Sequence, residues 1–147
     1  MRDSFQVTYG ELPPTSNKIY FRGTQLTAKA REYAERFAEQ MRQHLHLINE
    51  MDPNALYALH LRFFFFELVN KSWNNMDLPP SKRAKSRYKK IDLSNRIKLL
   101  EDCIRDALAI DDSQTFAASQ EKHQCGPGEP ERVEILVQRV SPSLFGL

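Results

Sequence analysis

Residues 89–114 constrain the fold of this chain more than any other stretch, because they contain one complete amphipathic helix and both of its ends. Apolar residues recur there at the three- and four-residue steps of one helical face: Ile97, Leu100, Ile104 and Leu108. Asp92 precedes the helix, where a carboxylate can accept hydrogen bonds from unpaired N–H groups and interact favourably with the helix dipole. We therefore expect a helix that packs its apolar face on a core.

A polar stripe with the same spacing runs beside the apolar one, rotated by one residue: Asn95, Lys98, Asp102 and Asp106. One interpretation is a solvated face on which Lys98 and Asp102 form an ion pair across one turn. The other is a functional surface that presents an amide, an ammonium and two carboxylates. The stripe alone leaves both open.

Length and composition fit one ordinary globular domain over residues 1–147, with 41% apolar and 27% charged residues. The net charge of +2 hides a local basic run between positions 82 and 90, which contains no acid: Lys82, Arg83, Lys85, Arg87, Lys89 and Lys90. Without these six charges the rest of the chain carries −4. The basicity of this protein is therefore local.

The remaining patterns predict a β-α-β-α-β-β order of elements. A half-exposed strand is expected at residues 5–9, and a long helix from Thr27 to just before Asp52. The aromatic-rich residues 55–66 suit a central strand covered on both faces. The last two strands are expected at 114–123 and 132–140, with an irregular basic loop at 67–91 and a frayed tail at 141–147. The fold class is α+β: a single domain whose mixed sheet carries helices packed on it.

Two further features bear on the cellular setting. Cys103 and Cys125 lack metal-binding spacing, so we expect a buried thiol and a loop thiol. The longest apolar run contains His60 and Arg62 and is too short to cross a bilayer. A cytoplasmic protein without membrane partners is the expectation.

The motif Asp92-x-Ser94-Asn95-x-x-Lys98-x-x-x-Asp102, followed by Asp111-Asp112-Ser113-Gln114, resembles the RusA family of Holliday junction resolvases. That family carries D-x-D-N-x-x-K-x-x-x-D-A-L and then D-D-x-Q. Residues 13–20, PPTSNKIY, are similar to its P-P-S-x-N-x-x-Y segment. The similarity extends over about residues 5–140 in the same order of elements, so the resemblance implies a RusA-like fold.

The resemblance implies a homodimeric, Mg²⁺-dependent endonuclease, often borne by phages or prophages, that cuts four-way junctions symmetrically in recombination and repair. Mn²⁺ is expected to be able to replace Mg²⁺. Catalytic roles map onto Asp92, Lys98 and Asp112, and metal binding onto Asp92 and Asp112. Ser94 replaces the second aspartate of D-x-D, so it is expected to hold the metal weakly or through water. The alternative is a protein of the same fold that binds branched DNA with weak or lost catalysis.

Phosphodiester hydrolysis needs these residue types whatever the family. Mg²⁺ offsets charge on phosphoryl oxygens, activates water, and prefers one or two carboxylates as protein ligands. Lys98 offers a compact positive charge for the charge that develops in the transition state. Taken alone, however, Asp111-Asp112 is also typical of a solvated turn before a strand.

The basic run favours DNA as the partner. Lysines and arginines contact phosphates, and Trp73 or Tyr88 could stack on an unpaired base. The alternative is a solvated loop. Residues 63–66, four phenylalanines, are interpreted as core and dimer interface rather than as a DNA platform.

Helix length predicts how Asp92 and Asp112 can meet. A helix from Ser94 to Leu108 separates its ends by roughly 22 Å, and residues 109–111 return at most about 10 Å. Two antiparallel helices in a two-fold dimer would bring Asp92 of one protomer beside Asp112 of its partner. We therefore expect two composite sites per dimer. Asp102 lies roughly 15 Å along the helix from Asp92 and cannot share its ion.

Overall fold

The computed structural model describes residues 1–23 and 25–147 and contains one four-stranded mixed sheet. Its strands are β1 (Ser4–Tyr9), β4 (Leu56–Phe65), β5 (Thr115–Gln124) and β6 (Arg132–Val140), in the spatial order β1-β6-β4-β5. β4 pairs parallel with β5, and the other two pairs are antiparallel. The short strands β2 (Tyr20–Phe21) and β3 (Gln25–Leu26) form a separate hairpin.

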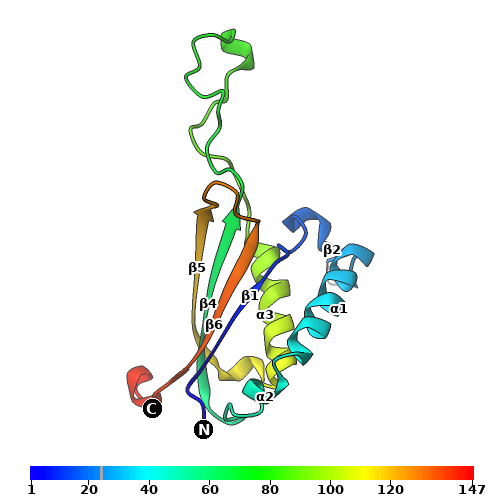
Figure 1. Cartoon of the computed structure of the whole chain (residues 1–147), viewed down its shortest axis with the longest axis vertical. Coiled ribbons are helices and arrows are strands. Elements are labelled where there is room, and N and C mark those ends of the chain that lie inside the picture. The colour runs from blue at the N-terminus through cyan, green and yellow to red at the C-terminus, as the bar shows by residue number, and fades with distance from the viewer. Residues whose placement is uncertain (24) are drawn as a thin grey trace.

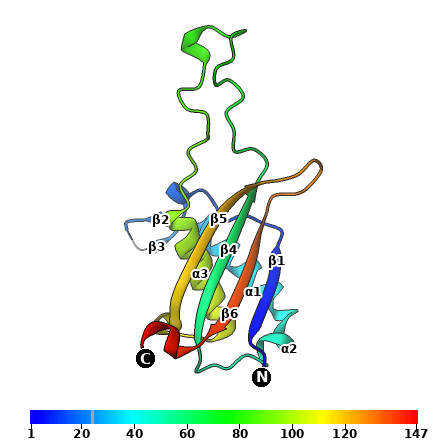
Figure 2. The same cartoon turned by 90° about the vertical axis from the view of Figure 1, so that its left-hand side faces the viewer.

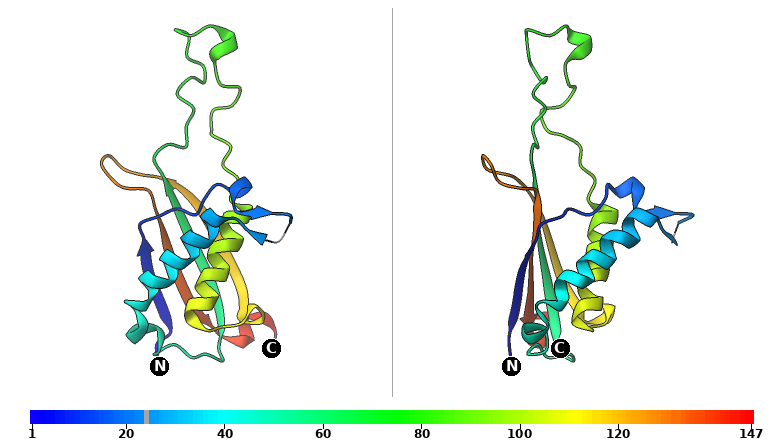
Figure 3. Two further views of the ribbon diagram at one scale, coloured as in Figure 1. Left: turned by 90° about the vertical axis from the view of Figure 1, so that its right-hand side faces the viewer. Right: turned by 45° about the vertical axis from the view of Figure 1, so that its right-hand side comes forward.

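Three helices pack on one face of the sheet: α1 (Ala28–Arg42), α2 (Leu45–Ile48) and α3 (Ser94–Leu108) (Figure 3). The predicted order of elements and the α+β class are confirmed. The Thr27 hydroxyl accepts from the N–H of Ala30 at 3.2 Å and caps α1, which begins one residue after the predicted start. The first helix is shorter than expected, because the chain turns after Arg42 and resumes as α2.

The core lies between the helices and the inner face of the sheet. Alternate residues of β4 point into it, so Leu59, Leu61, Phe63 and Phe65 are buried. The expectation that β4 is covered on both faces is wrong: Arg62 is exposed on the opposite face, and no helix of residues 1–23 and 25–147 lies there (Figure 3). Phe66 is 64% exposed, so the four phenylalanines divide between core and surface.

Residues 67–91 leave the end of β4 and project well beyond the sheet before returning to α3 (Figures 1 and 2). The two arms pair near their base: the N–H of Asn70 donates to the Arg87 carbonyl at 2.8 Å, and that of Lys89 to the Leu68 carbonyl at 2.9 Å. One 3₁₀ turn, Pro80–Lys82, lies at the tip. Apart from this turn and an isolated bridge between Val69 and Tyr88, the segment lies outside helices and strands.

The C-terminal tail is more ordered than the sequence suggests. Residues Pro142–Phe145 form a 3₁₀ turn, and the Phe145 ring meets the Phe116 ring edge-on with centroids 5.3 Å apart. Both chain ends lie at the end of the sheet opposite the projecting loop (Figure 1). In the described part of the chain, every helix is too short or too polar to cross a membrane.

Candidate active site

Asp92 lies where the projecting loop returns to the domain and α3 begins. Its Oδ1 accepts from the N–H of Ser94, the first helical residue, at 2.9 Å. This bond and the Ser94 hydroxyl lower the pKa of Asp92, and the positive charges of Arg96 and Lys122 act in the same direction. Leu93 occupies the N-cap position, and Asp92, one residue earlier, accepts the hydrogen bond from the first helical N–H that its sequence position predicts. Asp92 thus presents an exposed, ionised carboxylate at neutral pH.

Residues 13–17 are fastened against the start of α3 by hydrogen bonds between distant parts of the chain. The Ser16 hydroxyl donates to the Asp92 carbonyl at 2.7 Å, and the Asn95 amide donates to the Ser16 carbonyl at 2.9 Å. Arg96 Nε donates to the Pro14 carbonyl at 3.0 Å. The Pro-Pro-Thr-Ser-Asn segment therefore fixes the backbone that carries Asp92, and Asn95 serves this structure rather than a solvated stripe.

A cavity of about 440 Å³ opens beside Asp92. The residues that line it belong to the segment before β2, the end of β4, the end of the projecting loop and the first turns of α3: Thr15, Ser16, Asn17, Phe65, Lys90, Ile91, Asp92 and Arg96. The cavity thus combines one carboxylate with two cationic side chains. Its size far exceeds the roughly 30 Å³ that one water occupies in the liquid, which leaves room for a phosphodiester.

Ser94 and Lys98 extend from the same end of α3 but in different directions. Ser94 is exposed beside Asp92. The Lys98 ammonium lies 4.8 Å from the centroid of the Tyr20 ring, on the side of the helix that faces β2. The alternative pairing of Lys98 with Asp102 is not observed, because Asp102 instead accepts from Arg105 Nη2 at 2.7 Å.

Asp112 lies at the opposite end of α3, in the 3₁₀ turn Asp112–Gln114. Its carboxylate is 3.3 Å from Arg105 Nη2, while Arg105 Nη1 is 3.4 Å from Glu101. Burial alone would lower the pKa of Arg105, but the hydrogen bond to Asp102 and the neighbouring carboxylates raise it. The Asp112 side chain remains 83% exposed, so it can face a partner molecule.

The two predicted metal carboxylates do not meet within one chain. The observed α3 has the 15 residues assumed from the sequence, which correspond to roughly 22 Å between its ends. Among residues 1–23 and 25–147, no three His, Cys, Asp or Glu side chains cluster closely enough to hold a metal ion. One chain by itself therefore does not fit a magnesium site built from Asp92 and Asp112.

The projecting loop presents most, but not all, of its predicted DNA-binding residues to solvent. Lys82, Lys85, Arg87, Lys89 and Lys90 are exposed, with Lys89 Nζ 3.4 Å from a Glu67 oxygen. Arg83 is an exception: its Nε donates to the carbonyls of Asn75 and Leu78, both at 2.9 Å, and thereby holds the tip together.

An aromatic pair flanks one of these basic residues. The Arg87 guanidinium lies 5.8 Å from the Trp73 ring centroid and 5.4 Å from that of Tyr88. Both rings are exposed, at 37% for Trp73 and 60% for Tyr88. Rings and cation therefore present a surface on which a base could stack.

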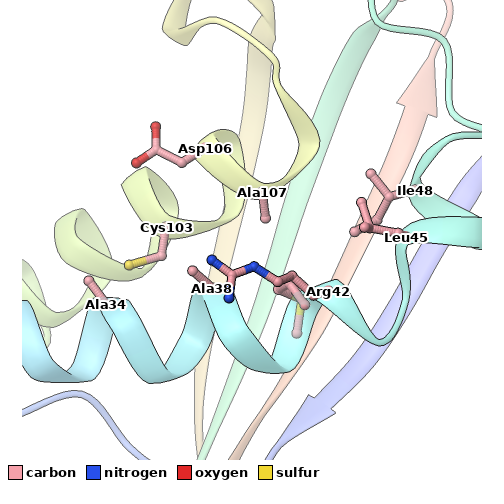
Figure 4. Close-up of a pocket in the computed structure, with 9 residues that line it drawn as sticks. Ala34, Ala38, Arg42, Leu45, Ile48, Cys103, Asp106 and Ala107 are labelled. Atoms are coloured by element: carbon pink, nitrogen blue, oxygen red, sulfur yellow. The ribbon is translucent and has the colours of Figure 1, made fainter.

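A second cavity, of about 240 Å³, lies between the C-terminal halves of α1 and α3 and beside α2 (Figure 4). Ala34, Ala38 and Ala107 line it together with Cys103, and Arg42 and Asp106 mark its polar border. Cys103 is buried as predicted, and burial raises the pKa of its thiol to about 12. None of the predicted site residues lines this cavity.

Sequence reasoning missed three charged residues near the predicted site: Arg96, Lys122 and Arg105. Arg96 could have been found, because it precedes Leu99 and Leu100 by three and four positions and thus lies on the buried stripe. Lys122 influences Asp92 from the end of β5, and only the parallel pairing of β4 with β5 brings it there.

A family model described as Endodeoxyribonuclease RusA matches residues 11–138, which include Asp92, Lys98 and Asp112. No curated protein matches. Among solved structures, the periplasmic domain of Helicobacter pylori MotB (residues 78–256) is 16% identical, with a TM-score of 0.37, over 99% of this chain and 83% of that one.

Proposed function

The chain belongs to the RusA family of endodeoxyribonucleases, and we propose that it resolves four-way DNA junctions by hydrolysing phosphodiesters symmetrically. The observation that carries this proposal is the placement of Asp92. Its ionised carboxylate lies at the start of α3, at the mouth of a cavity with cationic walls, directly below a projecting basic loop. A nuclease for branched DNA requires these three features together: an acid, a phosphate pocket and a surface for the duplex arms.

We propose Mg²⁺ as the cofactor, with Mn²⁺ as a substitute. When bound, Mg²⁺ would offset phosphoryl charge and lower the pKa of a bound water. Asp92 would be its main ligand, and Ser94 would act weakly or through water. Lys98 would supply positive charge to the reacting phosphate, which requires that its ammonium leave the Tyr20 ring.

We propose that the active site is completed by a second copy of the chain. Asp112 is exposed at the far end of α3, so a two-fold pairing of antiparallel α3 helices would bring it to the partner's Asp92. Two identical sites per homodimer suit the paired cuts that resolution of a junction requires. The Arg105 ion pair would orient Asp112 for this contact.

The projecting loop supports branched DNA as the substrate. Its exposed lysines can neutralise phosphates, while the rings of Trp73 and Tyr88 can stack on a base unpaired at the branch point. Affinity from such a loop would depend on DNA shape and charge rather than on sequence.

Cleavage of a synthetic four-way junction tests the proposal. Each strand is end-labelled in turn, and cutting is followed with Mg²⁺, with Mn²⁺ and with EDTA. We expect nicks at matching positions of two opposite strands only when a divalent metal is present. The control is a linear duplex of the same sequence, and equal cutting of junction and duplex would contradict structure selectivity.

A second candidate function is favoured by Ser94. With this side chain neutral, the start of α3 supplies fewer carboxylates than the family motif provides, so catalysis could be weak or lost while binding remains. Tight, metal-independent binding of the junction without any cutting would establish this branched-DNA-binding function instead.

A further inference from the structure

A buried arginine lines the cavity beside Asp92. Arg96 is 8% exposed, and its guanidinium carbon lies 5.5 Å from the centroid of the Phe65 ring. Nε donates to the Pro14 carbonyl, but Nη1 is buried without a hydrogen-bond partner among residues 1–23 and 25–147. A guanidinium carries five N–H donors, and the two on Nη1 have no partner among the described residues.

The charge of Arg96 is also incompletely offset. Glu131 and Asp92 are the carboxylates whose charge reaches it, yet Arg96 forms no ion pair with any described residue. Glu131 instead accepts from the N–H of Phe66 at 2.9 Å, and Asp92 from that of Ser94. A buried cation without a paired anion is costly, and a protein commonly retains one where a ligand supplies the missing charge.

A purely structural role would not need this charge. The bond to Pro14 requires one donor, which a neutral side chain could provide, and Ser16 and Asn95 already hold the same segment. The positive end of the α3 dipole lies at the same place, and Lys90 adds a second cation to the cavity wall. The combination is typical of a phosphate pocket rather than of a hydrophobic core.

We propose that Arg96 binds the DNA phosphate that is cut, through a non-bridging oxygen, and holds it beside Asp92. The guanidinium geometry suits two parallel hydrogen bonds to a phosphate, which would fix the orientation of the phosphodiester as well as its position. Arg96 is thus a substrate-binding residue of the active site. This inference rests on the proposed nuclease function.

A thermodynamic cycle between protein and DNA tests the inference by binding alone. The cleavage position is first mapped with the wild-type protein, and a junction is then made with a neutral methylphosphonate at that position. Both junctions are titrated with Asp92→Asn and with Asp92→Asn/Arg96→Met, which avoids cutting. We expect the methylphosphonate to weaken binding by Asp92→Asn about tenfold, as for one charge-assisted contact, and by less than about twofold once Arg96 is replaced.

Two controls isolate the contact. A methylphosphonate several nucleotides from the cut should weaken binding equally for both proteins, and Lys85→Met in the loop should leave the penalty at the cut phosphate unchanged. Methionine keeps the length of the arginine stem on Phe65. If Arg96→Met does not melt cooperatively, Arg96→Gln takes its place, because its amide can still donate to Pro14.

The inference would be overturned if the effects of Arg96→Met and of the methylphosphonate on binding were additive. It would also be overturned if the methylphosphonate did not weaken binding while Arg96 is present. Either result would leave the nuclease proposal standing. Failure of the Asp92→Asn protein to bind any junction would overturn both. The two failures are therefore distinguishable in one set of titrations.

Discussion

Asp92 combines a structural and a proposed chemical role in one side chain. It caps α3 through the N–H of Ser94, and it offers the carboxylate on which metal binding is proposed. Asparagine caps a helix about as well as aspartate does, so Asp92→Asn separates the two roles. We expect cleavage to disappear while junction binding is kept or tightened, because repulsion of the phosphate falls. Gel-shift titrations, strand-cleavage assays and thermal melts measure the three quantities.

The matched control for this variant is Asp106→Asn, an exposed aspartate on the same helix that lies away from the Asp92 cavity. It should cut at the wild-type rate. Cleavage by Asp92→Asn at a rate close to wild type would show that the site assignment is wrong.

Ser94 is the position at which this chain departs from the family motif. It is exposed at the first residue of α3, where an acidic side chain interacts favourably with the helix dipole. Ser94→Asp should therefore fold normally and reach half-maximal cleavage at a lower Mg²⁺ concentration. The measurement is the cleavage rate as a function of Mg²⁺, with Ser94→Ala as the control. If Ser94→Asp does not change the dependence of cleavage on Mg²⁺ while Asp102→Asn abolishes cleavage, the metal ion is not bound beside Ser94.

At the scale of elements, α3 ends on a residue in a strained conformation. Ala109 has φ 53° and ψ 39°, the left-handed region that glycine adopts without a steric penalty. Ala109→Gly is expected to raise the free energy of unfolding by about 0.5–1 kcal/mol, after allowing for the entropy of glycine in the unfolded chain. Urea denaturation measures the change.

The neighbouring helical alanine provides the control for that prediction. Ala107→Gly lies inside α3 and should lower the free energy of unfolding by roughly 1 kcal/mol. The same substitution two positions apart should thus have opposite signs. A decrease in stability in both variants would contradict the left-handed termination of α3.

The projecting loop is expected to set DNA affinity through charge. Arg83 holds the loop tip and should be left intact, so the useful variant is Lys82→Gln/Lys85→Gln. The dependence of log K on log salt should flatten by about 0.9 for each phosphate that the variant loop no longer neutralises. Binding titrations at several salt concentrations measure the slope.

The control variant loses the same number of positive charges at the opposite end of the molecule. Arg2 and Arg42 form exposed ion pairs with Glu50 and Glu39, which contribute little to stability. Arg2→Gln/Arg42→Gln should leave the slope unchanged. An unaltered slope in the lysine variant as well would identify the loop as a solvated linker.

At the scale of the whole molecule, the proposed composite site can be tested by mixing two inactive proteins. Asp92→Asn and Asp112→Asn should each be unable to cut, but a heterodimer of the two contains one site with both aspartates. We expect subunit exchange to restore nicking of one strand, measured on an end-labelled junction. If verified heterodimers stay inactive, each site is built within one protomer and the composite arrangement is wrong.

Local periodicity determined much of what the sequence could predict. The bounds of α3, the Asp92 cap and the strand at 132–140 depend on neighbours within a few residues, and the structure confirms all three. The prediction that β4 is covered on both faces was wrong, because an apolar sequence does not show how many layers pack on a strand. The burial of Arg96 could be predicted from its place on the apolar stripe, but its partner could not, because the Pro14 carbonyl lies 82 positions away.

The sequence by itself therefore determined the order of elements and the family, and it supplied the acidic residues of the proposed site, since each of these depends on residue type and spacing along the chain. The length of α3 already separated Asp92 from Asp112, because a straight helix holds its two ends apart. Only the tertiary structure decided which side chains share a cavity with Asp92, namely Arg96 and Lys90. Packing against distant segments buries one arginine beside Asp92 and leaves its charge available for a phosphate.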